Sequence, residues 1–214
     1  MTSSKLPSAE ALDAAYRRRY PVLEVIAIAL EELVNDYFRG EPRIDRITTR
    51  AKDIDHFVEK ALRTKNKKRK YPDPMSQIQD QIGARIITFY RADVERLDKI
   101  VLRYFTPIES KDLVPDSEWE FGYFGRHHVL LLPSDVLPED ADSTFVPRFF
   151  ELQIKTLFQH AWSEAEHDLG YKPGESPLTS DQERKLAFTS AQAWGADHIF
   201  DELFRERSVR EPGS

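Results

Sequence analysis

Polar residues that alternate with apolar ones between positions 150 and 155 are the first residues of this chain that could do chemistry. The segment reads Phe-Glu-Leu-Gln-Ile-Lys. On a β-strand this alternation places Glu151, Gln153 and Lys155 on one face and the apolar side chains on the other. An acid, an amide and a base on one strand face are typical of the wall of a cleft. A solvated sheet face would show the same alternation, so the spacing by itself leaves both interpretations open.

A helix is predicted directly after this strand, because the apolar period changes at Thr156 and Gly170 is suited to a C-terminal cap. In this helix His160, Glu164 and His167 follow the spacing i, i+4, i+7, which suggests a metal site. A carboxylate-bridged di-iron bundle needs two Glu-x-x-His helices, whereas the sequence offers only Glu164-x-x-His167. We therefore expect these side chains to support the helix and the cleft wall rather than to bind a transition metal.

A second group of candidate residues lies in the basic segment from Arg46 to Lys70. A helix that begins at about Lys52 would place four residues on one face, at i, i+4, i+8 and i+11: Lys52, His56, Lys60 and Arg63. Like charges stacked in this way repel one another, and a bound polyphosphate would offset the repulsion. The run from Lys65 to Lys70 suits a solvated basic loop, and also a localisation signal or an RNA contact.

Two further segments combine polar residues with predicted strands. Asp80-x-x-Gly83-x-Arg85 leads into a strand that ends near Tyr90, where the acid could be an ordinary cap. Tyr123 follows a glycine at a junction between a loop and a strand, and an aromatic side chain in that place can stack on a nucleobase. The adjacent His127 and His128 would point to opposite faces of the strand, so they do not suit one metal site.

Apolar spacing predicts the elements that must position these residues. They are a helix from Ser8 to Tyr20, a second helix from Pro21 to Gly40, a helix from Arg91 to Tyr104, a loop from Lys111 to Glu120 and a final helix capped by Asp181. Helices that alternate with strands predict an α+β fold in layers. We divide the chain into a helical region at 1–40, a core at 41–172 and a C-terminal helix at 173–214 that packs on the core or on a partner subunit.

Composition restricts the classes of function that fit. The chain has 214 residues, 40% of them hydrophobic, a net charge of -6 and no cysteine. Disulfides, thiolate catalysis and cysteine-ligated zinc are excluded. The negative charge gives no general attraction to nucleic acid or lipid, so we expect neither DNA nor a membrane as a partner. No long apolar run or signal-like N-terminus is present, which favours a cytoplasmic protein.

Four segments of the chain together resemble the RelA/SpoT family of alarmone synthetases. They are Arg50-x-Lys52 with Lys60, Asp80-x-x-Gly83-x-Arg85, Tyr123 with His127, and Glu151-x-Gln153-Ile154-Lys155-Thr156 with its helix. The segments stand in the order of the family and span most of the chain. With no hydrolase domain before them, they resemble the small, stand-alone members.

The resemblance implies both a fold and an activity. The fold is a mixed sheet flanked by helices, related to nucleotidyltransferases. The activity is transfer of the β,γ-pyrophosphate of ATP to the 3′-hydroxyl of GDP or GTP, which makes (p)ppGpp, with Mg²⁺ as the cofactor. The implied ligands of the ATP phosphates are Arg50, Lys52, Lys60 and Arg63. The implied Mg²⁺ ligands are Asp80 and Glu151, and Glu151 also orients or deprotonates the acceptor hydroxyl. The implied acceptor-binding residues are Tyr123, His127, Gln153 and Lys155.

Departures from the family pattern gather on the acceptor side. Phe124 and Gly125 replace Arg and Ser, Lys155 replaces Arg, and on the donor side His56 stands where Ser is usual. An adenine acceptor, which would give (p)ppApp, and the tRNA 3′ end modified by the toxin branch of the family therefore stay open beside guanine nucleotides. The resemblance also implies a homo-oligomer or, in the toxin branch, an antitoxin as partner. An RNA- or protein-binding module without catalysis is the non-enzyme alternative.

Overall fold

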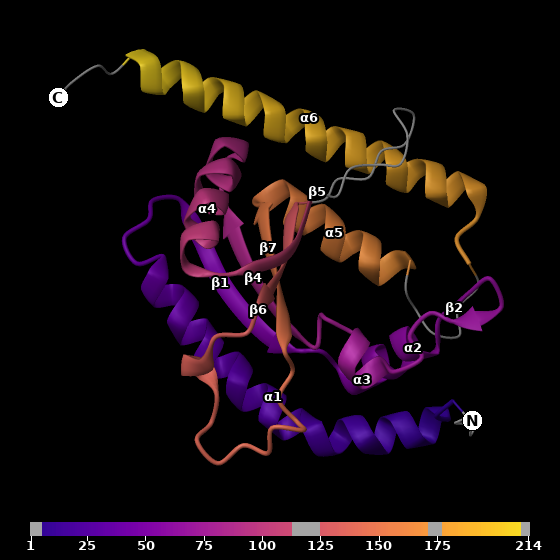
Figure 1. Ribbon diagram of the computed structural model, residues 1–214. Coiled ribbons are helices and arrows are strands. Elements are labelled where there is room, and N and C mark those ends of the chain that lie inside the picture. Colours follow the sequence, from indigo (N-terminus) through magenta and orange to yellow (C-terminus); the bar gives the residue numbers. More distant parts are fainter. Residues whose placement is uncertain (1–5, 113–124, 171–176, 211–214) are drawn as a thin grey trace.

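The architecture is a mixed β-sheet covered by helices, in a computed structural model that describes residues 6–112, 125–170 and 177–210 (Figure 1). The main sheet has five strands in the order β1-β4-β7-β6-β5. The strands are β1 (Ile44–Ala51), β4 (Ile82–Thr88), β5 (Pro107–Asp112), β6 (Arg126–Leu131) and β7 (Phe149–Thr156), and β2 (Thr64–Lys65) pairs with β3 (Lys68–Arg69) in a separate hairpin. The helices are α1 (Ala9–Tyr37), α2 (Ile54–Leu62), α3 (Pro74–Gln77), α4 (Arg91–Tyr104), α5 (Leu157–Gly170) and α6 (Ser180–Arg210), with a 3₁₀ turn at Ser134–Val136.

Strand β7 lies at the centre of the sheet and sets its mixed character. It runs parallel to β4 and antiparallel to β6. Phe150, Leu152 and Ile154 are fully buried, so the alternation predicted for this strand is confirmed. One face of the sheet is therefore apolar, and the other carries the polar residues.

The apolar face packs on α1 and α4. Leu23, Ile26 and Leu30 of α1 and Leu97 and Val101 of α4 join the inward-facing strand residues in one hydrophobic cluster. Burial of such side chains is worth about 1.5–3 kcal/mol each. Helix α1 thus shares the core of the sheet. In Figure 1 it runs along the side of the molecule opposite α6, with the sheet between them.

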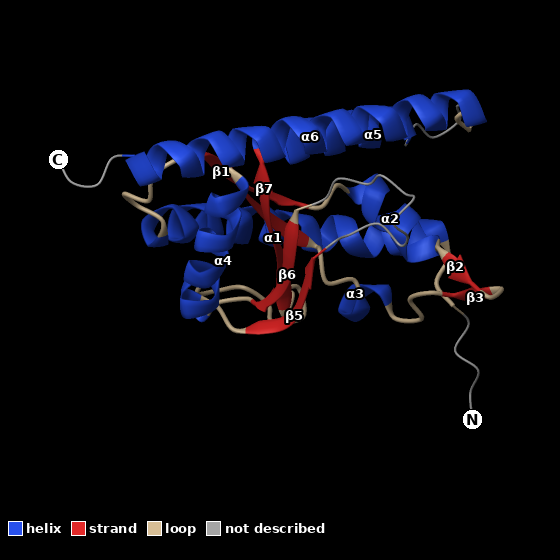
Figure 2. Cartoon of the chain, turned by 90° about the horizontal axis from the view of Figure 1, so that it is seen from above, coloured by secondary structure: helices blue, strands red, loops and turns tan. Residues whose placement is uncertain are grey.

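Helices α5 and α6 complete the other side of the molecule. Thr156, the last residue of β7, caps α5: its hydroxyl accepts from the N–H of Gln159 at 3.1 Å. The same hydroxyl donates to the buried Asp197 of α6 at 2.6 Å. Helix α6 is therefore tied to the point where the central strand becomes a helix. Seen from above, it crosses the molecule over α5 (Figure 2).

Several predicted boundaries were wrong. The two N-terminal helices are one helix, with Pro21 inside it, because the packing of both halves on the core outweighs the missing hydrogen bond at proline. The helix predicted from about Lys52 is the shorter α2, which leaves Lys52 and Arg63 outside it. The basic segment also holds strand β1 and the hairpin β2–β3, whose turn residues Asn66 and Lys67 have positive φ values of 53° and 63°.

Two smaller boundaries also differ from the sequence prediction. Lys111 and Asp112, predicted as loop, end strand β5. The final helix begins at Ser180, and the Thr179 hydroxyl accepts from the N–H of Gln182, so Thr179 rather than Asp181 caps it.

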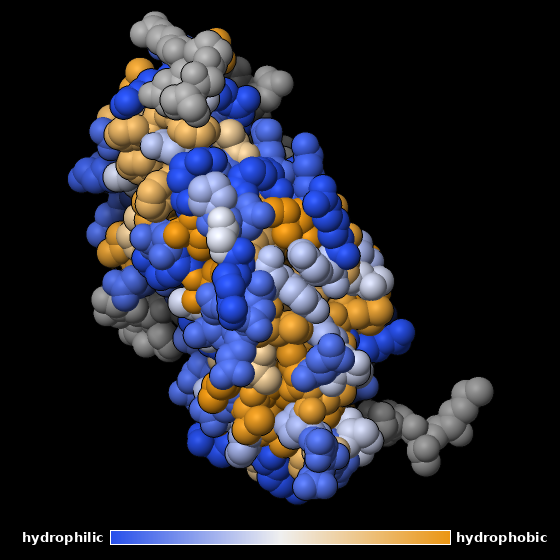
Figure 3. Space-filling view, turned by 90° about the vertical axis from the view of Figure 1, so that its left-hand side faces the viewer, coloured by the Kyte–Doolittle hydropathy of each residue, from blue (hydrophilic) through white to orange (hydrophobic). Residues whose placement is uncertain are grey.

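The surface is of mixed polarity. The face in Figure 3 interleaves apolar and hydrophilic side chains. Among the helices that the structure describes, none is long and apolar enough to cross a membrane.

Candidate active site

The polar face of the sheet brings the four sequence segments together in rows. Arg50 of β1 stands opposite Gly83 of β4, which stands opposite Glu151 of β7. In the next row Arg85 stands opposite Gln153, and Gln153 stands opposite His127 of β6. Side chains of directly paired residues point to the same face of a sheet. Residues far apart in the sequence thus form one polar surface.

Asp80 lies at the end of this surface, just before β4, and holds two lysines. Its Oδ2 accepts from Lys52 Nζ at 3.0 Å and from Lys60 Nζ at 2.7 Å. Burial would raise the pKa of the Asp80 carboxyl, but the two ammonium groups outweigh burial and lower it. Two cations thus meet one carboxylate, and they leave one positive charge for an anionic ligand.

Glu151 forms the second acidic centre. Its Oε1 lies 3.2 Å from His127 Nδ1, and its Oε2 accepts from Gln153 Nε2 at 2.9 Å. Burial would raise the pKa of Glu151, but the interactions with His127 and Gln153 lower it overall. The carboxylate is therefore ionised at neutral pH and oriented from two sides. The negative charge of Asp80 tends to raise the pKa of Glu151, so the two carboxylates interact electrostatically.

Three buried polar atoms of this site have no hydrogen-bond partner within the described part of the chain: Asp80 Oδ1, His127 Nε2 and Gln153 Oε1. Buried polar atoms are nearly always paired in proteins. Three such atoms around two carboxylates therefore indicate a place for a ligand.

The site suits a magnesium ion together with phosphate groups. Mg²⁺ prefers oxygen ligands, and it is commonly held by one or two carboxylates plus substrate phosphates and water. Asp80 Oδ1 and Glu151 would supply the carboxylates. Among the described residues no cluster of three or more His, Cys, Asp or Glu side chains could hold a metal by itself. The donor set thus fits a metal that takes its remaining ligands from a bound molecule.

Gly83 leaves open space in the middle of the surface. A Cβ atom built on Gly83 would meet no atom within 4 Å. Because Gly83 stands between Arg50 and Glu151, the space lies between a cation and a carboxylate. The glycine thus leaves room for a ligand on the surface of the sheet.

Comparison with known proteins identifies the family. A model of the region found in RelA and SpoT proteins matches residues 49–176, more than half of the chain. The chain belongs to the RelA/SpoT family. The matched region includes every candidate site residue, from Arg50 to Lys155.

Relatives and solved structures agree with this assignment. GTP pyrophosphokinase YjbM of Bacillus subtilis (strain 168) is 26% identical over 162 residues, which cover 73% of this chain and 70% of YjbM. Small alarmone synthetase 1 from Bacillus subtilis bound to its product pppGpp has a TM-score of 0.65 at 24% identity, covering 94% of this chain and 98% of that one. The same synthetase bound to AMPCPP has a TM-score of 0.63 at 21% identity, covering 92% and 98%. The mixed α+β fold predicted from the sequence is confirmed.

Within this RelA/SpoT fold, Lys155 lies beneath α5. It is 5% exposed, and its Nζ donates to Ser163 Oγ at 2.9 Å. Burial, together with the nearby charge of Arg85, lowers the pKa of Lys155 from 10.5 to about 8. Gly125 is required beside it, because a Cβ there would lie 2.6 Å from Lys155 Cγ and 2.3 Å from the Ile154 carbonyl oxygen. The serine usual at this family position would not fit.

The helix residues that suggested a metal site have other partners. Arg85 Nη1 donates to Glu164 Oε1 at 2.6 Å and lies 3.2 Å from His160 Nδ1. Burial would raise the pKa of Glu164, and Arg85 lowers it overall. The ring of His167 lies 5.8 Å from that of His56 on α2. These contacts join α5 to β4 and to α2, as the sequence prediction of a supporting role implies.

The remaining predicted residues are less central. Arg63 follows α2, is exposed and pairs with Glu59 at 3.4 Å. Arg50 is exposed on the polar face. Tyr123, the predicted stacking residue, lies outside the described residues.

Two residues of α1, not predicted from the sequence, contact the segments that carry Lys52 and Asp80. The Tyr16 hydroxyl donates to the main-chain oxygen of Lys52 at 3.0 Å. Arg19 Nη1 donates to the side-chain oxygen of Gln81, the neighbour of Asp80, at 2.7 Å. The only signal in the sequence was an arginine at the apolar period of a helix, which by itself predicts no partner.

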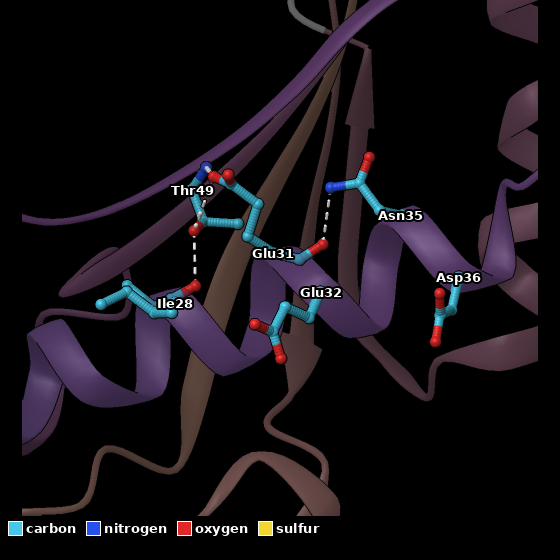
Figure 4. Close-up of a pocket in the computed structure, with 7 residues that line it drawn as sticks. Ile28, Glu31, Glu32, Asn35, Asp36 and Thr49 are labelled. Atoms are coloured by element: carbon cyan, nitrogen blue, oxygen red, sulfur yellow. Dashed lines mark hydrogen bonds between the residues drawn. The ribbon is translucent and has the colours of Figure 1, made fainter.

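A separate hollow of about 540 Å³ lies between α1 and β1 (Figure 4). It is lined by Ala27, Ile28, Glu31, Glu32, Asn35, Asp36 and Thr49. Glu31 accepts from the main-chain N–H of Thr49 at 2.7 Å. Its carboxylate thus satisfies a backbone donor on the outer edge of the sheet, where β1 has no neighbouring strand. Thr49 and Arg50 are neighbours on β1 and point to opposite faces. The hollow thus lies apart from the polar surface described above.

Proposed function

We propose that this protein is an ATP-dependent pyrophosphokinase that transfers the β,γ-pyrophosphate of ATP to the 3′-hydroxyl of GDP or GTP and so makes (p)ppGpp. The observation that carries the proposal is the joining of two centres on one sheet face: Asp80 with its two lysines, and Glu151 with His127 and Gln153. The first suits a triphosphate and the second suits an attacking hydroxyl.

The donor side binds the phosphates of ATP. Lys52 and Lys60 turn from Asp80 toward the phosphate oxygens, and Arg50 adds a guanidinium from β1, where it can make two parallel hydrogen bonds to phosphate. Arg63 contributes from the end of α2 as a more distant cation. Asp80 and Glu151 would hold Mg²⁺, which supplies neutralisation of the charge that develops on the phosphates. Phosphoryl-type transfer depends mainly on such charge stabilisation and on in-line positioning.

The acceptor side presents the 3′-hydroxyl. Glu151 orients this hydroxyl and takes up its proton as the oxygen attacks the β-phosphorus of ATP. The bond between that phosphorus and the oxygen bridging it to the α-phosphate breaks, and AMP leaves. His127 Nε2 and Gln153 Oε1 would hydrogen-bond the sugar, which is supported by their burial without a partner in the described chain. Tyr123 would stack on the base, and Lys155 would contribute a positive charge beneath the acceptor.

Guanine is the acceptor base that the relatives support. YjbM is named a GTP pyrophosphokinase, and small alarmone synthetase 1 from Bacillus subtilis is described with pppGpp as its product. Adenine nucleotides stay the alternative within the same chemistry, since the departures at Phe124, Gly125 and Lys155 lie on the acceptor side.

The test is transfer of label from γ-labelled ATP with Mg²⁺ to a panel of acceptors: GDP, GTP, ADP, ATP and deacylated tRNA. We expect a labelled guanine nucleotide in which the new group is on the 3′ position, and no product from a 3′-deoxy acceptor. Label on an adenine nucleotide or on tRNA would keep the mechanism and reject the guanine assignment. Absence of transfer to every acceptor would reject the enzyme and leave the RNA- or protein-binding module.

The tRNA 3′ end is the second candidate acceptor, and the hairpin β2–β3 favours it. Lys65, Lys67, Lys68 and Lys70 are exposed there, directly after the helix that carries Lys60. A row of exposed cations next to the donor site suits an RNA backbone, and such binding weakens steeply with salt. This candidate also brings in the antitoxin partner of the toxin branch.

A further inference from the structure

Helix α1 contacts both sides of the donor centre through residues one turn apart. Tyr16 and Arg19 stand at positions i and i+3, so they share one face of the helix. Tyr16 is fully buried and Arg19 is 5% exposed. Both point away from solvent and toward the segments that carry Lys52 and Asp80.

Tyr16 fixes the lysine side of the centre. Its hydroxyl donates to the main-chain oxygen of Lys52 at 3.0 Å. Its ring stacks on Phe57 of α2, with the ring centroids 3.8 Å apart and the planes 5° from parallel. Helix α2 also carries Lys60. Burial raises the pKa of the Tyr16 phenol, so the hydroxyl keeps its proton and donates. One side chain therefore sets the backbone of Lys52 and the position of the helix that holds Lys60.

Arg19 fixes the carboxylate side. It donates to the side chain of Gln81 at 2.7 Å and to the main-chain oxygens of Met75 at 2.8 Å, Thr144 at 3.0 Å and Phe145 at 3.0 Å. Gln81 in turn donates to the main-chain oxygens of Met75 and Ile78, each at 2.9 Å. Gln81, the residue that follows Asp80, is thus fixed by hydrogen bonds to Arg19, Met75 and Ile78.

The two sides are joined to each other by the main chain. The N–H of Lys52 donates to the carbonyl oxygen of Gln81 at 2.8 Å. Tyr16 and Arg19 therefore contact the two ends of this hydrogen bond: Tyr16 contacts Lys52, and Arg19 contacts Gln81. The Asp80–Lys52 ion pair forms next to it in the chain, because Asp80 precedes Gln81. A shift of either end would turn the unpartnered Oδ1 of Asp80 away from its present direction.

Stability alone does not account for Arg19. All of its hydrogen-bond acceptors named above are neutral oxygens, and a buried guanidinium without a paired carboxylate costs folding free energy that an apolar side chain would avoid. A fixed geometry for the neighbours of Asp80 is the benefit that offsets this cost.

We infer that Tyr16 and Arg19 are positioning residues of the donor site, which set the geometry of Asp80, Lys52 and Lys60 for the magnesium complex of ATP without touching the nucleotide. The inference rests on the proposed function for the identity of the donor. It assigns the N-terminal helix a part in the reaction.

The experiment measures donor binding and catalysis in matched variants. The variants are Tyr16→Phe, which removes one hydroxyl, Arg19→Met, and Arg19→Lys, which keeps the charge and loses the fork of donors. Controls on the same helix are Tyr37→Phe, whose ring stacks on Tyr104 away from the site, and Arg17→Met, whose side chain pairs with Asp13 at the surface. The readouts are calorimetric binding of AMPCPP at several Mg²⁺ concentrations, the KM for ATP and for the acceptor, and the melting temperature.

We expect a selective loss on the donor side. Tyr16→Phe should weaken AMPCPP binding about fivefold, the value of one ordinary hydrogen bond, and Arg19→Met about 10- to 100-fold. Both should need more Mg²⁺, while the KM for the acceptor changes less than about twofold and Arg19→Lys recovers part of the loss. These ratios follow from a displaced ligand set rather than from lost stability.

Two outcomes would overturn the inference. Unchanged AMPCPP binding and Mg²⁺ dependence in Tyr16→Phe would show that the hydroxyl does not position the site, and this isosteric variant decides the question even where Arg19→Met fails to fold. Equal weakening of donor and acceptor that follows the loss of melting temperature would show a purely structural role. Failure of the wild-type protein to bind AMPCPP would instead reject the proposed function.

Discussion

Among single residues, Gly83 is one at which a substitution should lower activity without lowering stability. Its Cβ position is open, and alanine is usually more stable than glycine within a strand by about 0.5–1 kcal/mol. Gly83→Ala should therefore keep or raise the melting temperature. Its methyl group would enter the space between Arg50 and Glu151, and we expect kcat/KM for ATP to fall about 10- to 100-fold.

A matched glycine on α6 serves as the control for this prediction. A Cβ on Gly195 also meets no atom within 4 Å, and Gly195→Ala should stabilise the helix by about 0.5–1 kcal/mol without changing activity. Full activity in Gly83→Ala would contradict the placement of the ligand over this strand.

The buried ammonium of Lys155 predicts a dependence of stability on pH. Its pKa is lowered from 10.5 to about 8 in the folded protein. Between these two pH values the unfolded chain holds the proton and the folded chain has lost it, so the free energy of unfolding rises with pH, by up to about 1.4 kcal/mol per unit. Urea unfolding of the wild type should show this rise relative to Lys155→Met. The exposed Lys185→Met should show no such difference, and a Lys155→Met curve parallel to the wild type would contradict the assignment.

At the scale of elements, α1 carries a cost that a substitution can remove. Pro21 lies inside the helix, where it lacks an N–H and disturbs the preceding turn. Pro21→Ala should restore this turn and raise the free energy of unfolding by about 1–3 kcal/mol. Pro7→Ala, just before the helix cap, is the control and should change it little. An unchanged or lower stability in Pro21→Ala would mean that the proline favours α1 in another way.

Local patterns were enough to predict some elements and not others. Helix α4 begins and ends at the predicted residues Arg91 and Tyr104, and β7 follows the predicted alternation, because in both the apolar period reports directly on one buried face. Strand β1 was missed because arginine and threonine occupy its exposed positions and hide the alternation. Pro21 was predicted to begin a new helix because proline is favoured in the first turn of a helix. Only the contacts of both halves of α1 with the core show that the helix continues through it.

The site shows the same limit in another form. Asp80, Lys52 and Glu151 were predicted as site residues because each lies in a recognisable sequence motif. The contacts of Tyr16 and Arg19 could not be predicted, since they join residues 36 and 62 positions apart and end on a main-chain oxygen and a glutamine. Lys155 was predicted at the acceptor, whereas its burial beneath α5 depends on the packing of Ser163 and on the close approach of Gly125.

At the scale of the whole molecule, charge is distributed unevenly. The chain carries a net charge of -6, yet the hairpin β2–β3 and the donor centre are basic. Helix α6 leaves several large apolar side chains exposed, among them Phe188, Trp194 and Ile199. A homo-oligomer and an antitoxin partner stay predictions of the family resemblance.

The hairpin charges give a prediction that separates the acceptor classes. With a nucleotide acceptor, the double variant Lys65→Gln, Lys67→Gln should keep its activity within about twofold, because these side chains lie outside the Asp80 and Glu151 centres. With tRNA as acceptor, the loss of each phosphate contact should lower the slope of log affinity against log salt by about 0.7–0.9. The exposed pair Arg184→Gln, Lys185→Gln on α6 is the control. A large loss with nucleotide acceptors would contradict the separation of hairpin and site.

The role of Glu151 is tested most directly by the effect of Glu151→Gln on transfer of γ-label from ATP to GDP. The amide keeps the shape of the side chain and removes the charge that would hold the metal and take the proton. We predict a fall in kcat of about 10²–10³-fold or more, whereas Asp168→Asn, exposed on α5, should remain fully active. A Glu151→Gln protein that transfers label at the wild-type rate would show that this carboxylate takes no part in the reaction.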